Sequence, residues 1–86
     1  MKFLYVHSYI IYSIRLNRYY VGYSEDVQKR LAEHNSGISD FTSKTNDWQL
    51  KYTEIFANRK QAISREREIK NKKSRKYIEW LIAKSG

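Results

Sequence analysis

One acidic side chain falls on the face of a predicted helix that should pack against the protein. In the segment AISREREIK, Glu66 lies three residues after Ile63 and three before Ile69. The 3.6-residue helical period therefore places it on their apolar stripe. A carboxylate in that position is costly unless an arginine, a hydrogen-bonding tyrosine or a cation compensates for it. Glu66 is a candidate cation ligand, and a purely structural ion pair is the alternative.

A second pair of polar residues has helical spacing. Arg30 and His34 are four residues apart, so they lie on one face of the helix predicted around them. Val27 and Leu31 flank that face, which places Arg30 at the edge of the core. Arginine is suited to hold a phosphate, and histidine to move a proton. The alternative is an arginine that reaches out to solvent beside an exposed histidine.

Two tyrosines on a predicted hairpin complete the candidate set. Tyr12 and Tyr20 lie on opposite arms, and we expect both to project to one face, where their phenols could meet. Gly22 follows Tyr20 in the stretch YYVGYS. We expect Gly22 to let the backbone turn closely into the next helix, or to let a ligand approach it. Tyrosines in strands are otherwise packing residues.

The elements that must position these residues are three strands and three helices. Apolar and alternating segments predict strands over 8–14, 19–23 and 48–56, with side chains 48, 50, 52 and 54 pointing one way. The turn at 15–18, where Asn17 tolerates left-handed dihedrals, makes the first two strands an antiparallel hairpin. The order β-β-α-β-α-α predicts an α+β fold, a three-stranded antiparallel sheet flanked by helices.

Polar residues mark the ends of the three helices. Ser24 is the predicted cap of the first helix, and Gly37 its end. Asn58 is the predicted cap of the second helix, and Ser74 that of the third. The third helix has an apolar stripe at the spacing expected for packing, made of Tyr77, Ile78, Leu81 and Ile82.

Size and composition predict one small basic domain spanning residues 1–86. There is no cysteine for a disulfide or a thiolate metal site, and no apolar run of the roughly 20 residues that cross a membrane. The net charge is +8, with a dense basic cluster between residues 59 and 76. Such a cluster attracts polyanions, nucleic acid before an anionic membrane, although a solvated helix face is the alternative. A cytoplasmic location fits.

The ordered set of motifs resembles the GIY-YIG nuclease family, and within it the small single-domain, URI-type (YhbQ-like) members. The half-motifs are IIY, Ile10 to Tyr12, and YVG, Tyr20 to Gly22. YVGYSEDVQKRLAEH is similar to the family's strand-to-helix segment, FTSKTNDWQLKY to its loop and third strand, and AISREREIK to its glutamate-bearing helix. The resemblance covers residues 8–82. Ile10 replaces the first glycine, and Asn71 is a candidate stand-in for a late asparagine of larger members.

The resemblance implies a metal-dependent endonuclease that hydrolyses DNA phosphodiester bonds. Glu66 would hold one Mg²⁺ or Mn²⁺ in a one-metal mechanism, because only one suitable inward carboxylate is visible. Arg30 would grip the phosphate and Tyr12 would orient or deprotonate the attacking water. Tyr20 and His34 would complete the hydrogen-bond set. The residues expected to contact DNA are Arg59, Lys60, Arg65, Lys70 and Lys73.

Two other functions remain open at this stage. The first is a nucleic-acid-binding module of the same fold with little or no catalytic activity. The second is an interaction domain whose basic helix meets an acidic protein, although no dedicated protein partner can be inferred from the sequence. The sequence leaves open whether the target is branched or nonspecific duplex DNA, and whether RNA is cut instead.

Overall fold

The computed structural model describes residues 5–37 and 43–85. They form an antiparallel three-stranded sheet of order β2-β1-β3 with three helices, which confirms the predicted α+β fold and the order of its elements. The elements are β1 (Val6–Ser13), β2 (Arg18–Ser24), α1 (Val27–Asn35), β3 (Gln49–Phe56), α2 (Arg59–Lys72) and α3 (Arg75–Ser85).

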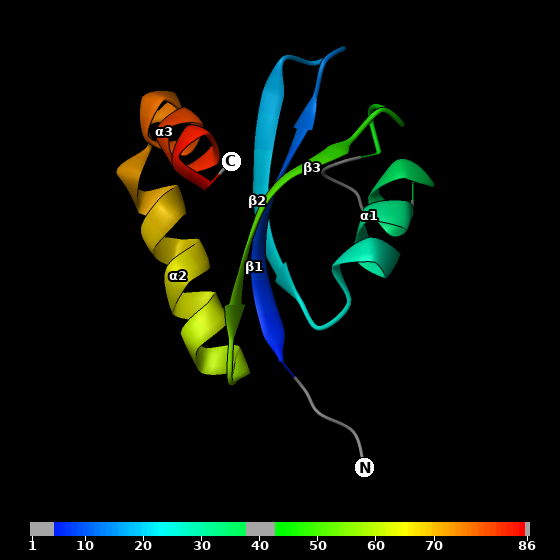
Figure 1. The fold of residues 1–86 in the computed structure, drawn as a ribbon. Helices are drawn as coiled ribbons and strands as arrows, with labels where there is room; N and C mark the ends of the chain where they lie inside the picture. Colours follow the sequence, from blue (N-terminus) through cyan, green and yellow to red (C-terminus); the bar gives the residue numbers. More distant parts are fainter. Residues whose placement is uncertain (1–4, 38–42, 86) are drawn as a thin grey trace.

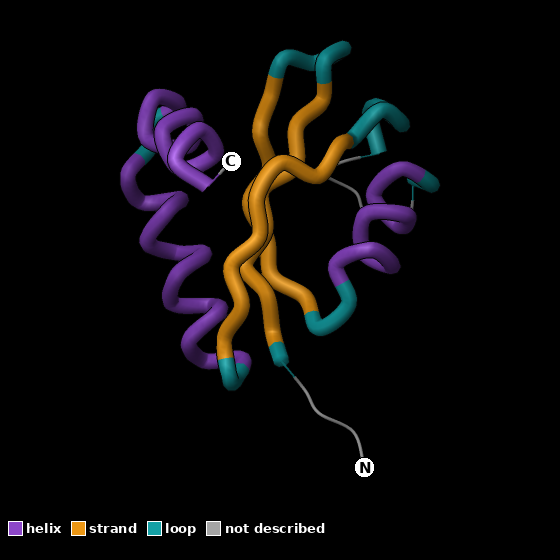
Figure 2. The backbone as a smooth tube through the Cα atoms, in the orientation of Figure 1, coloured by secondary structure: helices purple, strands orange, loops and turns teal. Residues whose placement is uncertain are grey.

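Helices cover both faces of the sheet. α2 and α3 lie together against one face, and α1 lies against the other (Figures 1 and 2). The central strand β1 is apolar on both sides, because Tyr9 and Ile11 enter the core beneath α1 whereas Ile10 enters the core beneath α2 and α3. Each functional side chain on β1 is therefore assigned to a face by its odd or even position.

The hairpin joining β1 and β2 has the predicted turn but not the predicted face assignment. Asn17 has a left-handed φ of 52°, as its position in the turn requires. In the strand register Tyr12 stands opposite Tyr19, and Ile11 stands opposite Tyr20. Residues directly opposite one another share a face, so Tyr12 and Tyr20 project to opposite faces of the sheet. The expectation that their phenols meet was wrong.

A bulge in β3 changes which of its side chains share a face. Ile10 pairs with Tyr52 and Ile11 pairs with Leu50, so one extra residue, Lys51, is inserted between them. Leu50 therefore packs in the core beneath α1, and Tyr52 packs in the core beneath α2 and α3. The prediction that the alternating residues of this strand all point one way was wrong, because the bulge breaks the alternation.

Side-chain caps fix the starts of the helices. The carboxylate of Asp26, not the hydroxyl of Ser24, caps α1 by accepting the backbone N–H three residues later at 3.1 Å. The Ser24 hydroxyl instead accepts the N–H of Asp26 at 3.1 Å and shapes the turn before the helix. Asn58 and Ser74 cap α2 and α3 as predicted. Gly37, with a φ of 83°, follows the end of α1, also as predicted.

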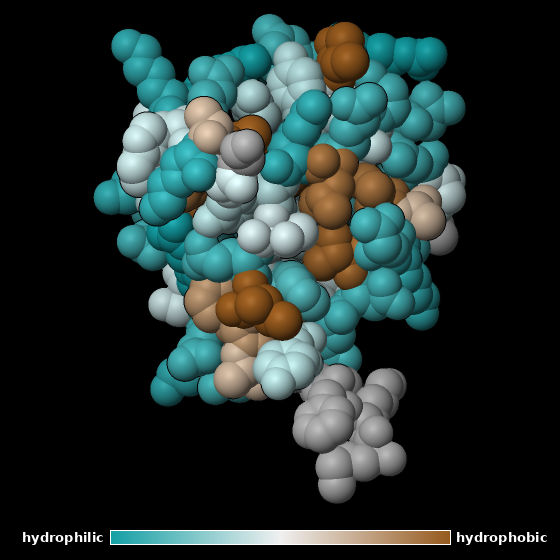
Figure 3. Space-filling view, viewed as in Figure 1, coloured by the Kyte–Doolittle hydropathy of each residue, from teal (hydrophilic) through white to brown (hydrophobic). Residues whose placement is uncertain are grey.

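The surface is largely hydrophilic. Figure 3 shows hydrophobic atoms in separate patches on the face in view, with hydrophilic residues around them. The large apolar side chains that are most exposed are Tyr5, Ile14, Ile55 and Trp80. Within the described part of the chain, no helix has the length and apolar character needed to cross a bilayer.

Candidate active site

A cleft of about 510 Å³ brings together side chains from four elements. β1 contributes Tyr9, β2 contributes Tyr20, α1 contributes Arg30, and α2 contributes Glu66. Three of these four residues were predicted as site residues from the sequence. Such a convergence of titratable groups in one concave surface is typical of an active site.

The phenol of Tyr9 is held against a buried histidine. Its oxygen lies 2.7 Å from Nε2 of His34, within hydrogen-bonding distance. Tyr9 is 2% exposed and the His34 side chain is fully buried. The ring of Tyr20 meets the His34 ring edge-on, with centroids 5.0 Å apart. His34 therefore lies behind the two tyrosines, where it can act on the cleft only through them.

Gly22 makes the position of Tyr9 possible. The two residues are direct partners across β1 and β2. A Cβ on Gly22 would lie 2.6 Å from the Tyr9 phenol oxygen and 2.7 Å from its Cζ, so any larger residue would collide with the ring. Gly22 lies inside β2 and has no positive φ. Its predicted role as a turn residue was wrong, because the glycine gives room to a side chain and not to a bend.

Burial keeps the Tyr9 and His34 pair uncharged. Desolvation raises the pKa of Tyr9 to about 12, assisted by Tyr20 and opposed by the nearby Arg30 guanidinium. Desolvation and the positive charge of Arg30 lower the pKa of His34 to about 4. At neutral pH Tyr9 is therefore protonated and His34 is neutral, so one imidazole nitrogen can accept a proton from the phenol.

Arg30 stands at the mouth of the cleft with an acidic neighbour. Its Nη1 donates to Oε1 of Glu33 at 2.9 Å, and the arginine side chain is 34% exposed. The hydrogen bond that Arg30 donates to Glu33 is the largest cause raising the Arg30 pKa. Glu33 thus orients a permanently charged guanidinium that still reaches solvent.

Glu66 approaches the cleft from the opposite side. Its side chain is only 13% exposed, in agreement with the inward face predicted from helical spacing. Lys70, one turn later, places its Nζ 3.6 Å from the Glu66 carboxylate and 5.8 Å from the centre of the Tyr20 ring. Within residues 5–37 and 43–85 there is no cluster of three histidine, cysteine or acidic side chains placed to hold a metal.

The structure does not bring Tyr12 to this cleft. The Tyr12 phenol donates to Oδ1 of Asn17 at 2.6 Å, and its ring lies 4.6 Å from that of Tyr19. Both rings lie on the sheet face covered by α2 and α3. Tyr9, three residues earlier, occupies the place predicted for Tyr12. The missed signal was Gly22 itself, because a ring that lies directly over its partner's Cα, as that of Tyr9 does, needs a glycine opposite it.

Arg65 also differs from its predicted role in contacting DNA. Its side chain is 17% exposed and donates to the Glu54 carboxylate at 3.1 Å, the Glu68 carboxylate at 2.9 Å and the Tyr77 phenol at 3.1 Å. These acceptors lie on β3, α2 and α3. Arg65 therefore joins three elements, and the donors on its Nε and Nη1 are already used inside the protein.

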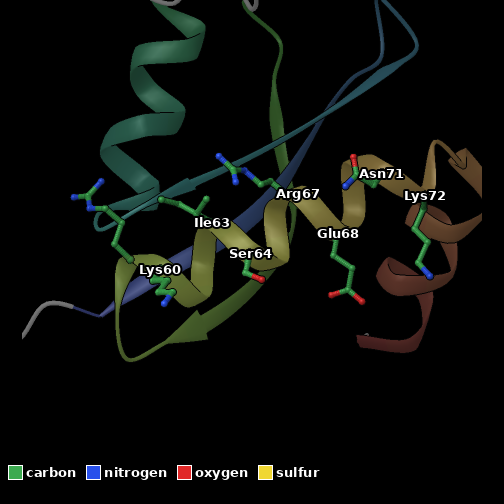
Figure 4. A pocket seen from close by; sticks show the side chains of 8 residues that line it. Lys60, Ile63, Ser64, Arg67, Glu68, Asn71 and Lys72 are labelled. Carbon is green, nitrogen blue, oxygen red and sulfur yellow. The ribbon is translucent and has the colours of Figure 1, made fainter.

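The other predicted basic residues, Arg59, Lys60, Lys70 and Lys73, are exposed along α2 and at its end. Arg59 lines the cleft and donates to the Glu25 carboxylate at 3.0 Å. A separate hollow is lined entirely by α2 residues, with Arg67 and Asn71 among them (Figure 4). Asn71 therefore lies on the outer surface of α2 and not among the residues that line the cleft, whereas Arg67 adds a cation that the predicted set omitted.

Comparison with known proteins identifies the family of this chain. The GIY-YIG catalytic domain family matches residues 5–78. The chain belongs to the GIY-YIG catalytic domain family. Membership places it in a family of nucleases, whose substrates are nucleic acids and which are generally dependent on a divalent metal.

Its relatives within the GIY-YIG family include UPF0213 proteins. The chain is 43% identical over 53 residues to one from Halobacterium salinarum, covering 60% of this chain and 69% of the relative. It is 35% identical over 63 residues to one from Staphylococcus saprophyticus, covering 72% and 77%. A solution NMR structure of a UPF0213 protein from Bacillus halodurans is 29% identical, with a TM-score of 0.60, covering 95% of this chain and 86% of that chain.

Proposed function

We propose that this protein is an endonuclease that hydrolyses DNA phosphodiester bonds with one divalent cation. The observation that carries the proposal is the single cleft in which Tyr9, Tyr20, Arg30 and Glu66 converge, with His34 directly behind Tyr9. These side chains supply a metal-binding carboxylate, a phosphate-binding guanidinium and a route for a proton. A metal-dependent phosphodiesterase uses all three.

The donor set around Glu66 fits one Mg²⁺ or Mn²⁺. Mg²⁺ is often bound through one or two carboxylates, with waters and substrate phosphate oxygens completing its coordination. Glu66 is a mostly buried carboxylate that lines the cleft. Its ion pair with Lys70 is long, at 3.6 Å, so a cation could replace the lysine as the partner of the carboxylate. When bound, the cation would neutralise developing charge and assist departure of the 3′-oxygen.

Arg30 would hold the phosphate. A guanidinium presents a planar fork of donors that matches two phosphate oxygens. One Arg30 nitrogen is bonded to Glu33, which restrains the guanidinium at the cleft that it lines. Tyr20, whose ring packs against His34, would complete the hydrogen-bonding set around the phosphate.

Tyr9 would take the role that the sequence assigned to Tyr12. With a pKa of about 12 the phenol is a poor base by itself. His34 changes this, because it can accept the Tyr9 proton at Nε2 while the phenol oxygen takes a proton from the attacking water. The low pKa of His34 opposes that transfer, but a phosphate bound by Arg30 would offset the positive charge that helps to depress it.

Cleavage of plasmid DNA in Mg²⁺ or Mn²⁺ tests the proposal. The wild-type protein should nick and linearise the plasmid, leaving 5′-phosphate and 3′-hydroxyl ends. Glu66→Ala should lose activity because the cation is no longer held, and Arg30→Ala because the phosphate is no longer gripped. EDTA should stop the wild-type reaction.

Two matched variants serve as controls. Glu68→Ala removes an exposed carboxylate from the same helix, and Lys51→Ala removes a surface cation from β3. Both should retain activity. Cutting that persists in both Glu66→Ala and Arg30→Ala would assign the activity to a contaminant. DNA binding without turnover in any divalent cation would favour a binding module of the same fold.

A further inference from the structure

A further hollow of about 620 Å³ lies beside the cleft, between the edge strand β2 and the junction of α2 and α3. Its walls combine aromatic, apolar and cationic side chains. We call it the β2 groove, and the residues that define its character are Arg18, Tyr19, Val21, Ile69, Lys73 and Ile78.

The β2 groove is continuous with the cleft. Tyr20 lines both hollows, so a chain that passes this tyrosine leaves one and enters the other. Lys70 lies at the same boundary, with its Nζ 3.6 Å from the Glu66 carboxylate and 5.8 Å from the centre of the Tyr20 ring. A polymer held in the cleft therefore has a direct path into the β2 groove.

The chemistry of the β2 groove is different from that of a surface for duplex DNA. Ile78 is partly exposed and supplies apolar surface above a floor of two buried core residues, Val21 and Ile69. Tyr19 adds an aromatic ring that is partly exposed. Bases that are not paired can place their faces on such surfaces, whereas paired bases in a duplex are stacked on one another and expose only their edges.

Cations follow the rim of the β2 groove where a backbone would pass. Arg18 and Lys73 are exposed and form no ion pair with any residue in the described part of the chain, and Lys70 is 48% exposed. Arg75 is less available, because it is bonded to Asn17 and Glu79. Cationic rims beside aromatic and apolar surfaces are the usual arrangement for single-stranded nucleic acid.

From these features we infer that the β2 groove binds an unpaired DNA strand next to the phosphate held in the cleft. The inference rests on the proposed endonuclease function and names its substrate class: DNA in which nucleotides beside the cut are unpaired, as in a fork or a flap. The unpaired strand would cross Tyr20, with its phosphates near Arg18 and Lys73.

Binding, measured without cutting, tests the inference. Protein carrying Glu66→Gln is titrated in EDTA against fluorescent forked DNA and a duplex of matched sequence. The test variant adds Arg18→Gln and Lys73→Asn, since asparagine tolerates the left-handed φ of 48° at residue 73. The control variant adds Lys51→Gln and Lys84→Gln, two exposed lysines outside the groove. Circular dichroism confirms that both variants fold, and Arg18→Gln alone is measured as a second probe.

The test variant should lose affinity for the fork selectively. When the logarithm of the binding constant is plotted against the logarithm of the salt concentration, each single-strand phosphate contact contributes about 0.7 to the slope. Losing two contacts should therefore lower the slope by about 1.4, which corresponds to about 25-fold weaker binding at about 0.1 M salt. Duplex affinity should fall no more than in the control variant. Equal losses on fork and duplex, or a fork loss no larger than the control's, would overturn the inference, as would displacement of the fork by an acidic peptide at equal concentration. Plasmid cleavage is measured separately, so a negative result for strand binding in the β2 groove would leave the proposed endonuclease function intact.

Discussion

The phenol oxygen of Tyr9 lies 2.7 Å from Nε2 of His34, and this contact joins the central strand of the sheet to the helix that carries Arg30. The two side chains are buried, so their geometry is set by the packing of the core. Under the proposed function, a proton relay through this contact would need no rearrangement before it acts, which would lower the cost of reaching the reactive geometry. The stability of the fold and the precision of the site consequently depend on the same residues.

Replacing Gly22 by alanine should lower the stability of the fold and displace Tyr9 from its position in the site. The added Cβ would meet the Tyr9 phenol oxygen and Cζ at 2.6–2.7 Å, too close for a carbon that forms no hydrogen bond. Overpacking of this kind costs about 1–3 kcal/mol, so urea unfolding of Gly22→Ala should show a loss of that size. In the double variant with Tyr9→Leu the clash is absent, and the two changes should be less than additive. Strict additivity would show that Gly22 and Tyr9 do not interact.

The His34 environment predicts a pH dependence of stability. Its pKa is lowered to about 4 in the folded protein, so between pH 6.5 and pH 4 the unfolded chain binds a proton that the folded protein does not. Stability should therefore be complete above pH 6.5 and fall as the pH is lowered toward 4, by on the order of 3 kcal/mol. Urea unfolding at pH 4.5, 5.5 and 7 measures this. His34→Gln should flatten the profile, and an unchanged profile in the variant would attribute the effect to other groups.

Arg65 and Arg67 are two residues apart, but we expect the first to matter for stability and the second for DNA binding. Arg65→Met removes hydrogen bonds to three side chains and leaves Glu54 without its arginine partner, so it should cost about 1–3 kcal/mol of stability. Arg67 lines the exposed hollow on α2, so Arg67→Met should leave stability nearly unchanged but weaken DNA binding. Thermal melting and anisotropy titrations separate the two effects. A larger DNA-binding defect in a folded Arg65→Met protein would restore Arg65 to the DNA-contacting set.

The sequence was sufficient for the elements of the fold because each has a local signal. Asn58 and Ser74 cap helices through bonds to backbone three residues away, and the stripe at the end of the chain follows the helical period. The inward position of Glu66 was found by the same reasoning, since a helix fixes which residues share a face.

The choice between Tyr9 and Tyr12 depended on a non-local property. A strand places alternate residues on opposite faces, so one step of register between β1 and β2 decides which tyrosine reaches the cleft. Neither the turn at Asn17 nor the apolar run of β1 fixes that step, because β1 is buried on both faces. The bulge at Lys51 could not be predicted from the sequence either, because it is defined only by the pairing of β3 with β1.

Single-turnover cleavage of a labelled DNA by Tyr9→Phe and Tyr12→Phe, compared side by side with wild type in Mg²⁺, tests the central claim most directly. Both variants remove one phenolic oxygen, but only the Tyr9 oxygen contacts His34 and lines the cleft. The rate should fall by about 10²–10⁴-fold in Tyr9→Phe and change by no more than about threefold in Tyr12→Phe. A wild-type rate in Tyr9→Phe together with an inactive Tyr12→Phe would contradict that claim.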